Sequence, residues 1–254
     1  MDDPNANGER SNRSVNWANI YDFYEVQMRD VYRTIARAQN ESHFELLKHY
    51  LKKKILNNHH FAEIGFGCGV TLRLASSYFE KVSGLDVSPK NVALTLQELE
   101  NEGYKNIELF VSDILQKDER FNGKFDVISF IHGLEHFSSL DYKEFFENIR
   151  NYLKPGGFFT GALPNNLIFN YRMCPHCRHV FEIDGHLSTF NVETLAAMFK
   201  MHNWTIIYLG SFNPNYFFKK NSLFRFLHGY GNFKILKKEA PMQLEFIVKK
   251  AGRG

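Results

Sequence analysis

The chain has 254 residues, of which 44% are hydrophobic and 23% charged, and its formal net charge is +3. This length and composition suit one globular domain with a sizeable core, and the charge is too small to indicate nucleic-acid binding on its own. Three cysteines are too few for a disulfide framework, so we expect a reducing compartment, the cytoplasm. The polar N-terminus predicts no signal peptide, and no apolar run is long enough to predict a transmembrane helix.

The first 57 residues divide into two segments of different composition. Residues 1–14 are polar and are predicted to be disordered. Over residues 15–57 the apolar residues recur at helical spacing, which predicts two or three helices, the last of them capped by Ser42. These helices could form a lid over a ligand site or simply cover a sheet.

Residues 61–72 contain the motif around which the other predicted elements are placed. An apolar run ends at Glu63, and Gly65, Gly67 and Gly69 follow before an apolar helical pattern resumes. Glycine permits a positive φ and a close approach of a ligand, and the amides at the start of the next helix would face that ligand. The segment therefore predicts a strand, a tight turn and a helix that together cradle a cofactor.

Strand and helix patterns alternate after this motif. Strands that are apolar on both faces and separated by helices predict a mostly parallel sheet with helices on both sides, which is the Rossmann-like α/β class. The predicted strands are 81–86, 107–111, 125–130, 158–162, 204–209 and 244–249, and the predicted helices are 89–102 and 142–153.

Acidic residues at the ends of the second and third predicted strands suit a nucleotide-like ligand. In an open α/β sheet, ligands bind beyond the carboxyl ends of the strands. Asp86 ends the second strand, where a carboxylate can accept both hydroxyls of a ribose, and Asp113 lies where an adenine amino group would be read. The glycine turn alone would equally suit a nicotinamide-dependent dehydrogenase.

Residues 58–165 resemble the class I S-adenosylmethionine-dependent methyltransferases. The resemblance rests on Glu63-Ile-Gly-Phe-Gly-Cys-Gly69, Leu85-Asp86-Val87-Ser88, Ser112-Asp113-Ile114, Phe125-Asp-Val-Ile and Leu153-Lys-Pro-Gly-Gly157. It implies a seven-stranded sheet whose last strand is antiparallel, and S-adenosylmethionine as the methyl donor. The implied cofactor-binding residues are Glu63, Gly65, Gly67, Gly69, Asp86, Val87, Asp113, Ile114 and His132. A dehydrogenase would more usually have its third glycine at position 70, which is Val70 here.

The segment Ile131–Phe137 follows the fourth predicted strand and faces the reacting methyl group in that fold. It is similar to the Glu-x-x-Glu-His segment of ubiquinone-pathway and small-RNA O-methyltransferases, which binds a divalent metal together with a later histidine. Here His132 replaces the first glutamate and His186 matches the later histidine, a donor set that suits softer ions than Mg²⁺. The segment could bind metal, supply His136 or His186 as a general base, or only pack and cap a helix.

Residues 166–190 form an insertion with a Cys-x-x-Cys motif. Cys174 and Cys177 would provide half of a tetrahedral zinc site. Three histidines could complete it: His176, His179 and His186. The alternative is a reduced cysteine pair in a loop. Because one histidine cannot readily serve both zinc and the active site, the two interpretations of His186 compete.

A second insertion, residues 212–240, mixes aromatic and basic residues. It could line an acceptor pocket, lie on a membrane surface, stack on bases or form a homodimer contact. A packed cap or a pocket wall is favoured, because the charge is modest and no amphipathic helix is sustained.

The sequence thus predicts a single methyltransferase domain over residues 15–254. The favoured reaction is in-line methyl transfer to a hydroxyl of a small molecule or glycan, because the histidine-rich loop suits deprotonation of an alcohol. The alternatives are N-methylation or a protein or RNA acceptor. In other classes of function, the chain would be a dehydrogenase or an inactive binding protein.

Overall fold

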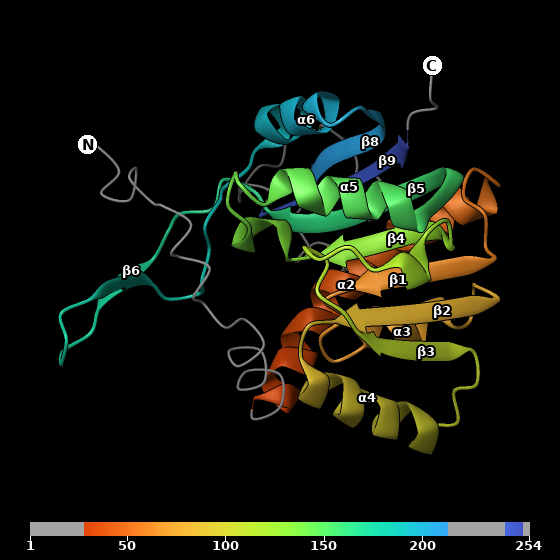
Figure 1. Ribbon diagram of the computed structural model, residues 1–254, viewed down its shortest axis with the longest axis horizontal. Coiled ribbons are helices and arrows are strands. Elements are labelled where there is room, and N and C mark those ends of the chain that lie inside the picture. The colour runs from red at the N-terminus through yellow and green to blue at the C-terminus, as the bar shows by residue number, and fades with distance from the viewer. Residues whose placement is uncertain (1–27, 213–241, 251–254) are drawn as a thin grey trace, which may run out of the picture.

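The computed structural model describes residues 28–212 and 242–250 (Figure 1). The predicted disordered tail, residues 1–14, and the interpretations of residues 213–240 lie outside the described residues. No helix in the described ranges is both long and apolar enough to cross a membrane.

A seven-stranded sheet in the order β3-β2-β1-β4-β5-β9-β8 forms the centre of the molecule. The first five strands in the chain run parallel, and β9 is antiparallel to both of its neighbours, β5 and β8. This arrangement confirms the predicted Rossmann-like class with an antiparallel last strand. The strands are β1 (His60–Ile64), β2 (Lys81–Asp86), β3 (Ile107–Val111), β4 (Phe125–Ile131), β5 (Leu153–Pro164), β8 (Trp204–Phe212) and β9 (Gln243–Lys250).

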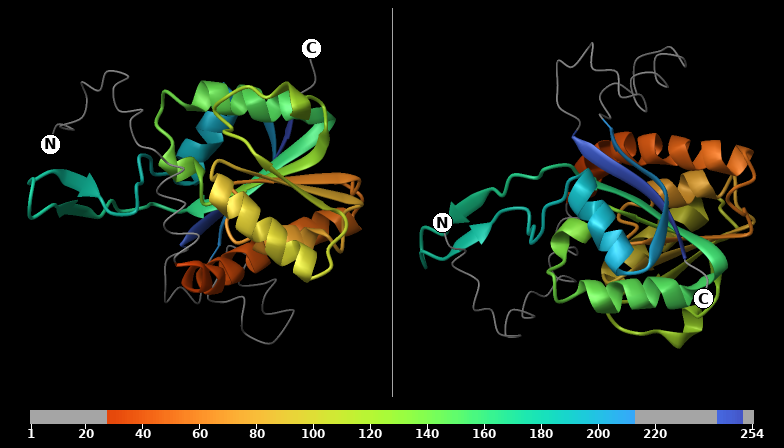
Figure 2. Two further views of the ribbon diagram at one scale, coloured as in Figure 1. Left: turned by 60° about the horizontal axis from the view of Figure 1, so that its bottom comes forward. Right: turned by 90° about the horizontal axis from the view of Figure 1, so that it is seen from above.

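Helices cover both faces of the sheet (Figure 2). Adjacent strand residues point to opposite faces, so each strand contributes to two apolar layers. The helices of one face are α2 (Arg29–Lys52), α3 (Val70–Ala75) and α4 (Pro89–Asn101), and those of the other are α5 (Tyr142–Tyr152) and α6 (Val192–Met201). Phe61, Val127 and Phe158 pack on the first face, whereas Ala62, Ile128 and Phe159 pack on the second.

The described part of the predicted helical region is one continuous helix, α2, and the prediction that Ser42 caps a separate helix is wrong. Ser42 is buried inside α2, and its hydroxyl donates to the carbonyl of Gln39 at 2.8 Å. Asn40 is also buried. Because these polar residues interrupt the apolar period while still facing the interior, the sequence pattern suggests a break that the helix does not have.

Strand β5 begins at Leu153, before the predicted start at residue 158. The Pro-Gly-Gly segment predicts a turn, but Leu153 pairs with Phe125, and the register then shifts before Val127 pairs with Phe158. Within the insertion at 166–190, two further strands form an antiparallel arm that the sequence did not predict. They are β6 (Tyr171–Met173) and β7 (Val180–Glu182), and the arm projects away from the sheet (Figure 1).

Glu245 of β9 and His43 of α2 form a buried polar pair between the sheet and the helix. Both side chains are fully buried, and His43 Nδ1 lies 3.9 Å from Glu245 Oε1. Burial raises the pKa of Glu245 to about 8. Burial, with a smaller contribution from His132, lowers the pKa of His43 to about 3. Both groups are therefore neutral near pH 7.

Replacing Glu245 with glutamine is expected to raise the free energy of unfolding at alkaline pH. The pKa of Glu245 is raised from 4.5 to about 8 on folding, so the folded state keeps a proton that the unfolded state releases between these pH values. Stability must fall as the pH rises through this window, by a few kcal/mol, on the order of 1.4 for each pKa unit. The free energy of unfolding of E245Q, measured with urea between pH 4.5 and about pH 8, should change less with pH than that of the wild type. The exposed-site control E80Q should retain the wild-type slope, and an unchanged slope in E245Q would refute the assignment.

Candidate active site

The loops after β1, β2, β3 and β4 meet at the carboxyl edge of the parallel strands, where ligands bind in such sheets. A pocket of about 360 Å³ opens there. It is lined by Val87, Val111, Ser112, Asp113, Gln116, Lys117, Asp118 and Glu119. The predicted cofactor residues Val87 and Asp113 thus share one pocket, beside the end of β2.

The loop between β1 and α3 adopts the backbone that its glycines permit. The φ angles of Gly65, Gly67 and Gly69 are 58°, 52° and 69°, a region that residues with a Cβ rarely occupy. A Cβ on Gly69 would also lie 2.9 Å from Arg73 Nη1. Arg73 donates to the carbonyl of Cys68 at 2.8 Å, so α3 holds the loop in place. Position 69 therefore needs glycine for its left-handed conformation, and a Cβ would in addition displace the Arg73 guanidinium.

Asp86 is held at the end of β2 by the start of α4. Its Oδ1 accepts the backbone N–H of Ser88 at 2.9 Å, and its Oδ2 accepts Asn91 Nδ2 at 3.2 Å. Asn91 Nδ2 also donates to the carbonyl of Gly67 at 3.0 Å. Asn91 therefore joins the glycine loop to the carboxylate that we expect to bind a ribose.

Arg29, in the first turn of α2, extends this network, although sequence analysis did not identify it. Its Nη1 donates to Asn91 Oδ1 at 2.9 Å, and its Nε donates to Glu98 Oε1 at 2.8 Å. Its carbonyl lies 3.6 Å from Cys68 Sγ in the glycine loop. The first turn of α2 thus lies against the loop, whereas Phe44, further along, is in the apolar layer on the sheet. Because all these contacts span long sequence separations, no local pattern could reveal them.

Asp113 and Ile114 turn the chain after β3. Asp113 Oδ1 accepts the backbone N–H of Leu115 at 2.9 Å, which fixes the turn. Ile114 is buried, and its carbonyl accepts Asn148 Nδ2 from α5 at 2.8 Å. The turn therefore sets the wall of the pocket. Binding of adenine by Asp113 and Ile114 remains a prediction.

The loop after β4 places a buried carboxylate at the same edge. His132 has a φ of 52°, and its Nδ1 lies 3.3 Å from Glu135 Oε1. A Cβ on Gly133 would lie 2.0 Å from the ring of Phe130, so only glycine fits there. Burial opposes the charge of Glu135, but the hydrogen bond and charge of His132 prevail, with a further effect of His136, and lower its pKa. Its Oε2 is buried and has no hydrogen-bond partner among the described residues.

His136 and His186 lie together beside Glu135, although 50 positions separate them in the sequence. Their rings stack with centroids 4.9 Å apart. His136 Nδ1 lies 3.1 Å from the carbonyl of Gly185, so this nitrogen carries the proton and Nε2 keeps its lone pair. Burial lowers the pKa of His136, and the ring is neutral at pH 7. Two backbone N–H groups, of Leu187 and Ser188, donate to the carbonyl of Glu135 and tie the segments together.

Among the described residues, His186 belongs to two groups of possible metal ligands, and one of them consists of Glu182, Asp184 and His186. One ligand atom from each of Glu135, His136 and His186 lies within 4.8 Å of the others, a set that could hold a metal ion. Among the described residues, no such group of three or more contains Cys174 or Cys177. His186 therefore lies at ligand distance from side chains at the sheet edge and at the base of the arm, and neither His186 nor His179 forms such a group with the cysteines.

Residues 36–209 match the protein family described as "Methyltransferase domain". The chain is similar to EEF1A lysine methyltransferase 2 of Homo sapiens, with 32% identity over 129 residues, covering 47% of this chain and 53% of that protein. It is also similar to Alpha N-terminal protein methyltransferase 1 of Arabidopsis thaliana, with 29% identity over 123 residues, covering 45% of this chain and 45% of that protein. The chain spans about half the length of the curated relatives it matches.

Solved structures share the fold over nearly the whole chain. One is the 1,6-didemethyltoxoflavin-N1-methyltransferase of Burkholderia thailandensis, with bound 1,6-didemethyltoxoflavin and S-adenosylhomocysteine. It has a TM-score of 0.65 and 14% identity, covering 99% of this chain and 94% of that one. An S-adenosylmethionine-dependent methyltransferase of Clostridium acetobutylicum has a TM-score of 0.64 and 17% identity, covering 89% of this chain and 98% of that one.

Proposed function

We propose that this chain, which belongs to the methyltransferase domain family, transfers a methyl group from S-adenosylmethionine to a nitrogen atom of a protein substrate. The family match covers residues 36–209, and the chain is an S-adenosylmethionine-dependent methyltransferase. The acceptor is the proposed part. It differs from the small-molecule or glycan hydroxyl that the sequence favours and takes up the alternative of a protein nitrogen.

The observation that carries the proposal is the identity to a protein lysine methyltransferase and to a protein N-terminal methyltransferase. Both relatives are named for amine acceptors on proteins. The site is compatible with an amine, because Glu135 is a buried anion whose Oε2 has no hydrogen-bond partner among the described residues. A buried carboxylate oxygen is stabilised by an N–H donor, which an amine supplies.

The residues present fit the methyl donor. The glycine loop takes the positive φ angles of a tight turn, and Asp86 and Asp113 flank it at the same sheet edge. Once bound, S-adenosylmethionine would supply a methyl group on a sulfonium sulfur, and that sulfur would become a neutral thioether after the methyl group is transferred. The protein has to align the acceptor and remove one proton from its nitrogen.

His136 is suited to accept that proton. Its Nδ1–H donates to Gly185, so the basic lone pair of the ring is on Nε2, and Glu135 beside it stabilises the imidazolium that forms. A lysine amine has an ordinary pKa of about 10.4 and must lose a proton before it can attack. The carboxylate of Glu135 provides a negative charge beside the protonated amine, and the neutral imidazole of His136 provides the base.

Replacing His136 with asparagine is expected to lower kcat by about 10²- to 10⁴-fold, the usual worth of a general base. Asparagine can keep the donor to Gly185 but lacks Nε2. The assay measures transfer of labelled methyl groups to peptides with a free lysine or α-amine and, in parallel, to sugars and phenols.

The matched control is H202N, because burial also lowers the pKa of His202 but its ring packs on Phe146, away from the site. H202N should keep the wild-type kcat, and H136N should bind S-adenosylhomocysteine normally. Turnover on hydroxyl acceptors and none on peptides would contradict the nitrogen proposal. Wild-type kcat in H136N would contradict the role of the base.

O-methylation assisted by a metal is the second candidate, favoured by the grouping of Glu135, His136 and His186. Two imidazoles and a carboxylate suit Zn²⁺ and similar ions. In that case activity on a hydroxyl acceptor should disappear with a chelator and return with added metal. Methyl transfer to an amine should be unaffected by the chelator.

A further inference from the structure

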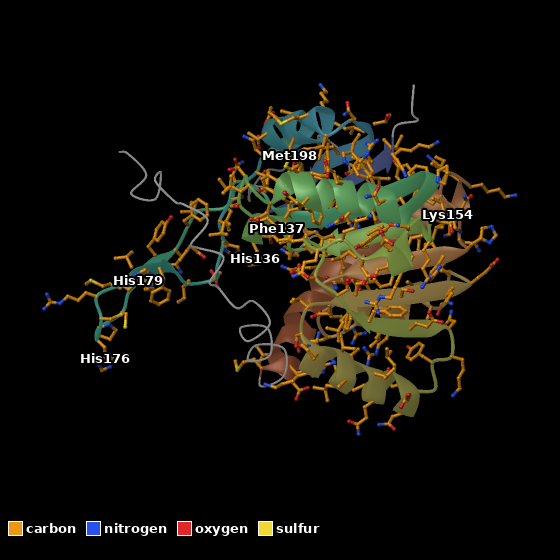
Figure 3. All side chains as sticks on the ribbon, in the orientation of Figure 1. His136, Phe137, Lys154, His176, His179 and Met198 are labelled. Carbon is orange, nitrogen blue, oxygen red and sulfur yellow. The ribbon has the colours of Figure 1, made fainter. Side chains whose placement is uncertain are left out.

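The arm of β6 and β7 carries a chemical group that the methyl-transfer site does not use. Figure 3 shows His176 at the free end of the arm, His179 further along it, and His136 near the point where the arm leaves the sheet. Cys174 and Cys177 lie in the turn at this free end, between the paired residues Met173 and Val180. The two cysteines are therefore presented away from the body of the molecule.

Backbone hydrogen bonds close the turn that carries the two cysteines. The backbone N–H of Cys174 donates to the carbonyl of His179 at 2.8 Å, and the N–H of Arg178 donates to the carbonyl of Cys174 at 2.9 Å. Arg178 takes a left-handed φ of 61°, which closes the turn.

Two cysteines are half of what a structural zinc ion requires. Structural zinc sites are almost always tetrahedral, with four cysteine or histidine ligands. Among the described residues, no other potential ligand atom completes a group of three with the cysteines. A two-fold axis through the ion would repeat the same pair and supply four ligands in one step.

We propose that Cys174 and Cys177 form one half of a zinc site, which a second copy of this chain completes with its own Cys174 and Cys177. Each of the four thiols releases its proton to solvent as it binds, and no electron is transferred. The zinc ion thereby joins two molecules at the tips of their arms. This inference is independent of the acceptor of the methyl group.

The surface of the arm agrees with a second copy as the partner. Cross-strand pairing puts Tyr171, Met173 and Val180 on one face of the ribbon, and their exposed fractions are 55%, 63% and 57%. An isolated two-stranded ribbon is marginally stable in water, and adjacent exposed apolar side chains mark an interaction surface. Because these side chains adjoin the cysteines, two arms joined at the zinc would bring the same apolar faces together.

The test uses the full chain and measures zinc content together with molar mass in solution. We expect one zinc ion for each two chains, a dimer by light scattering, and monomers after treatment with a chelator. Added ZnCl₂ should restore the dimer. Replacement of the zinc by Co²⁺ should give the absorption bands of a tetrahedral ion with four sulfur ligands.

The double variant C174S/C177S should lose the zinc and the dimer, with zinc affinity at least 100-fold weaker. The controls H176A and H179A should keep both. Since the arm is outside the sheet, the double variant and the wild type should melt alike in chelator, which separates loss of the site from misfolding. One zinc in each monomeric chain, no zinc on the wild type, or a dimer that survives the chelator would overturn the proposal.

Discussion

Replacing Asp86 with asparagine is expected to weaken binding of S-adenosylmethionine by about 10²- to 10⁴-fold. The physical reason is the loss of two charge-assisted hydrogen bonds to ribose hydroxyls, each worth about 1.5–3 kcal/mol. Calorimetric titration with S-adenosylhomocysteine measures the change directly. A thermal shift gives a second readout, because ligand at 100 times its Kd stabilises the wild type by about 2.7 kcal/mol.

The matched control is D126N. Asp126 is as buried as Asp86, both having 5% of their surface exposed, but it lies at the start of β4 and binds Lys154 Nζ at 2.6 Å. Lys154 is at the opposite end of the sheet from His136 (Figure 3). D126N should lower stability without changing cofactor affinity. If D86N and D126N bind the cofactor equally well, Asp86 does not bind the ribose.

The second large effect is expected for Glu98, replaced by glutamine. Its carboxylate accepts hydrogen bonds from Arg29, Arg33 and Arg73 at 2.8, 2.7 and 3.2 Å. Burial opposes its charge, but the hydrogen bonds and charges of Arg29 and Arg33 prevail and lower its pKa to about 2. E98Q leaves the buried Arg29 guanidinium without its counter-charge, and we expect a loss of about 2–4 kcal/mol in the free energy of unfolding.

The pH dependence gives this prediction a second test. The pKa of Glu98 is lowered from 4.5 to about 2 on folding, so its stabilisation is present above the unfolded value and lost as the pH falls through this window. When the free energy of unfolding is measured with denaturant, it should fall less steeply in E98Q than in the wild type as the pH falls from 4.5 to about 2. The control is E102Q, whose side chain is 41% exposed and pairs with Arg73; such exposed pairs are worth less than about 1 kcal/mol. Equal losses in the two variants would contradict the central role of Glu98.

Local pattern was sufficient for the elements that form the sheet. The predicted strands at 81–86 and 107–111 coincide with β2 and β3. β2 is buried after its first residue, whereas β3 is an edge strand whose residues are only partly buried or exposed. The glycine spacing likewise predicted the turn after β1, since its positive φ angles require glycine. Asp86 and Asp113 were found from their places at strand ends, because parallel topology brings those ends to one edge.

The boundaries of α2 and β5 depend on contacts between residues that are distant in the sequence. The continuity of α2 through Ser42 follows from burial against the sheet, which overrides the local break in the pattern. The early start of β5 depends on its pairing with Phe125. Neither Arg29 nor Glu245 has a local sequence signal, because burial and partners from other elements create their roles.

The sequence by itself determined the fold class, the cofactor edge and the chemical types present: a glycine loop, two strand-end carboxylates, clustered histidines and a cysteine pair. These features depend on backbone conformation and on the spacing of apolar residues over a few positions, and both are determined by the local sequence. Only the tertiary structure decided that His186 stacks on His136 while Cys174 and Cys177 lie at the tip of an arm. The arm carries Cys174 and Cys177 away from His186, although these residues are close in sequence. The sheet edge brings His136 and His186 together, although 50 positions separate them. Distances of that kind are set by packing and not by spacing along the chain.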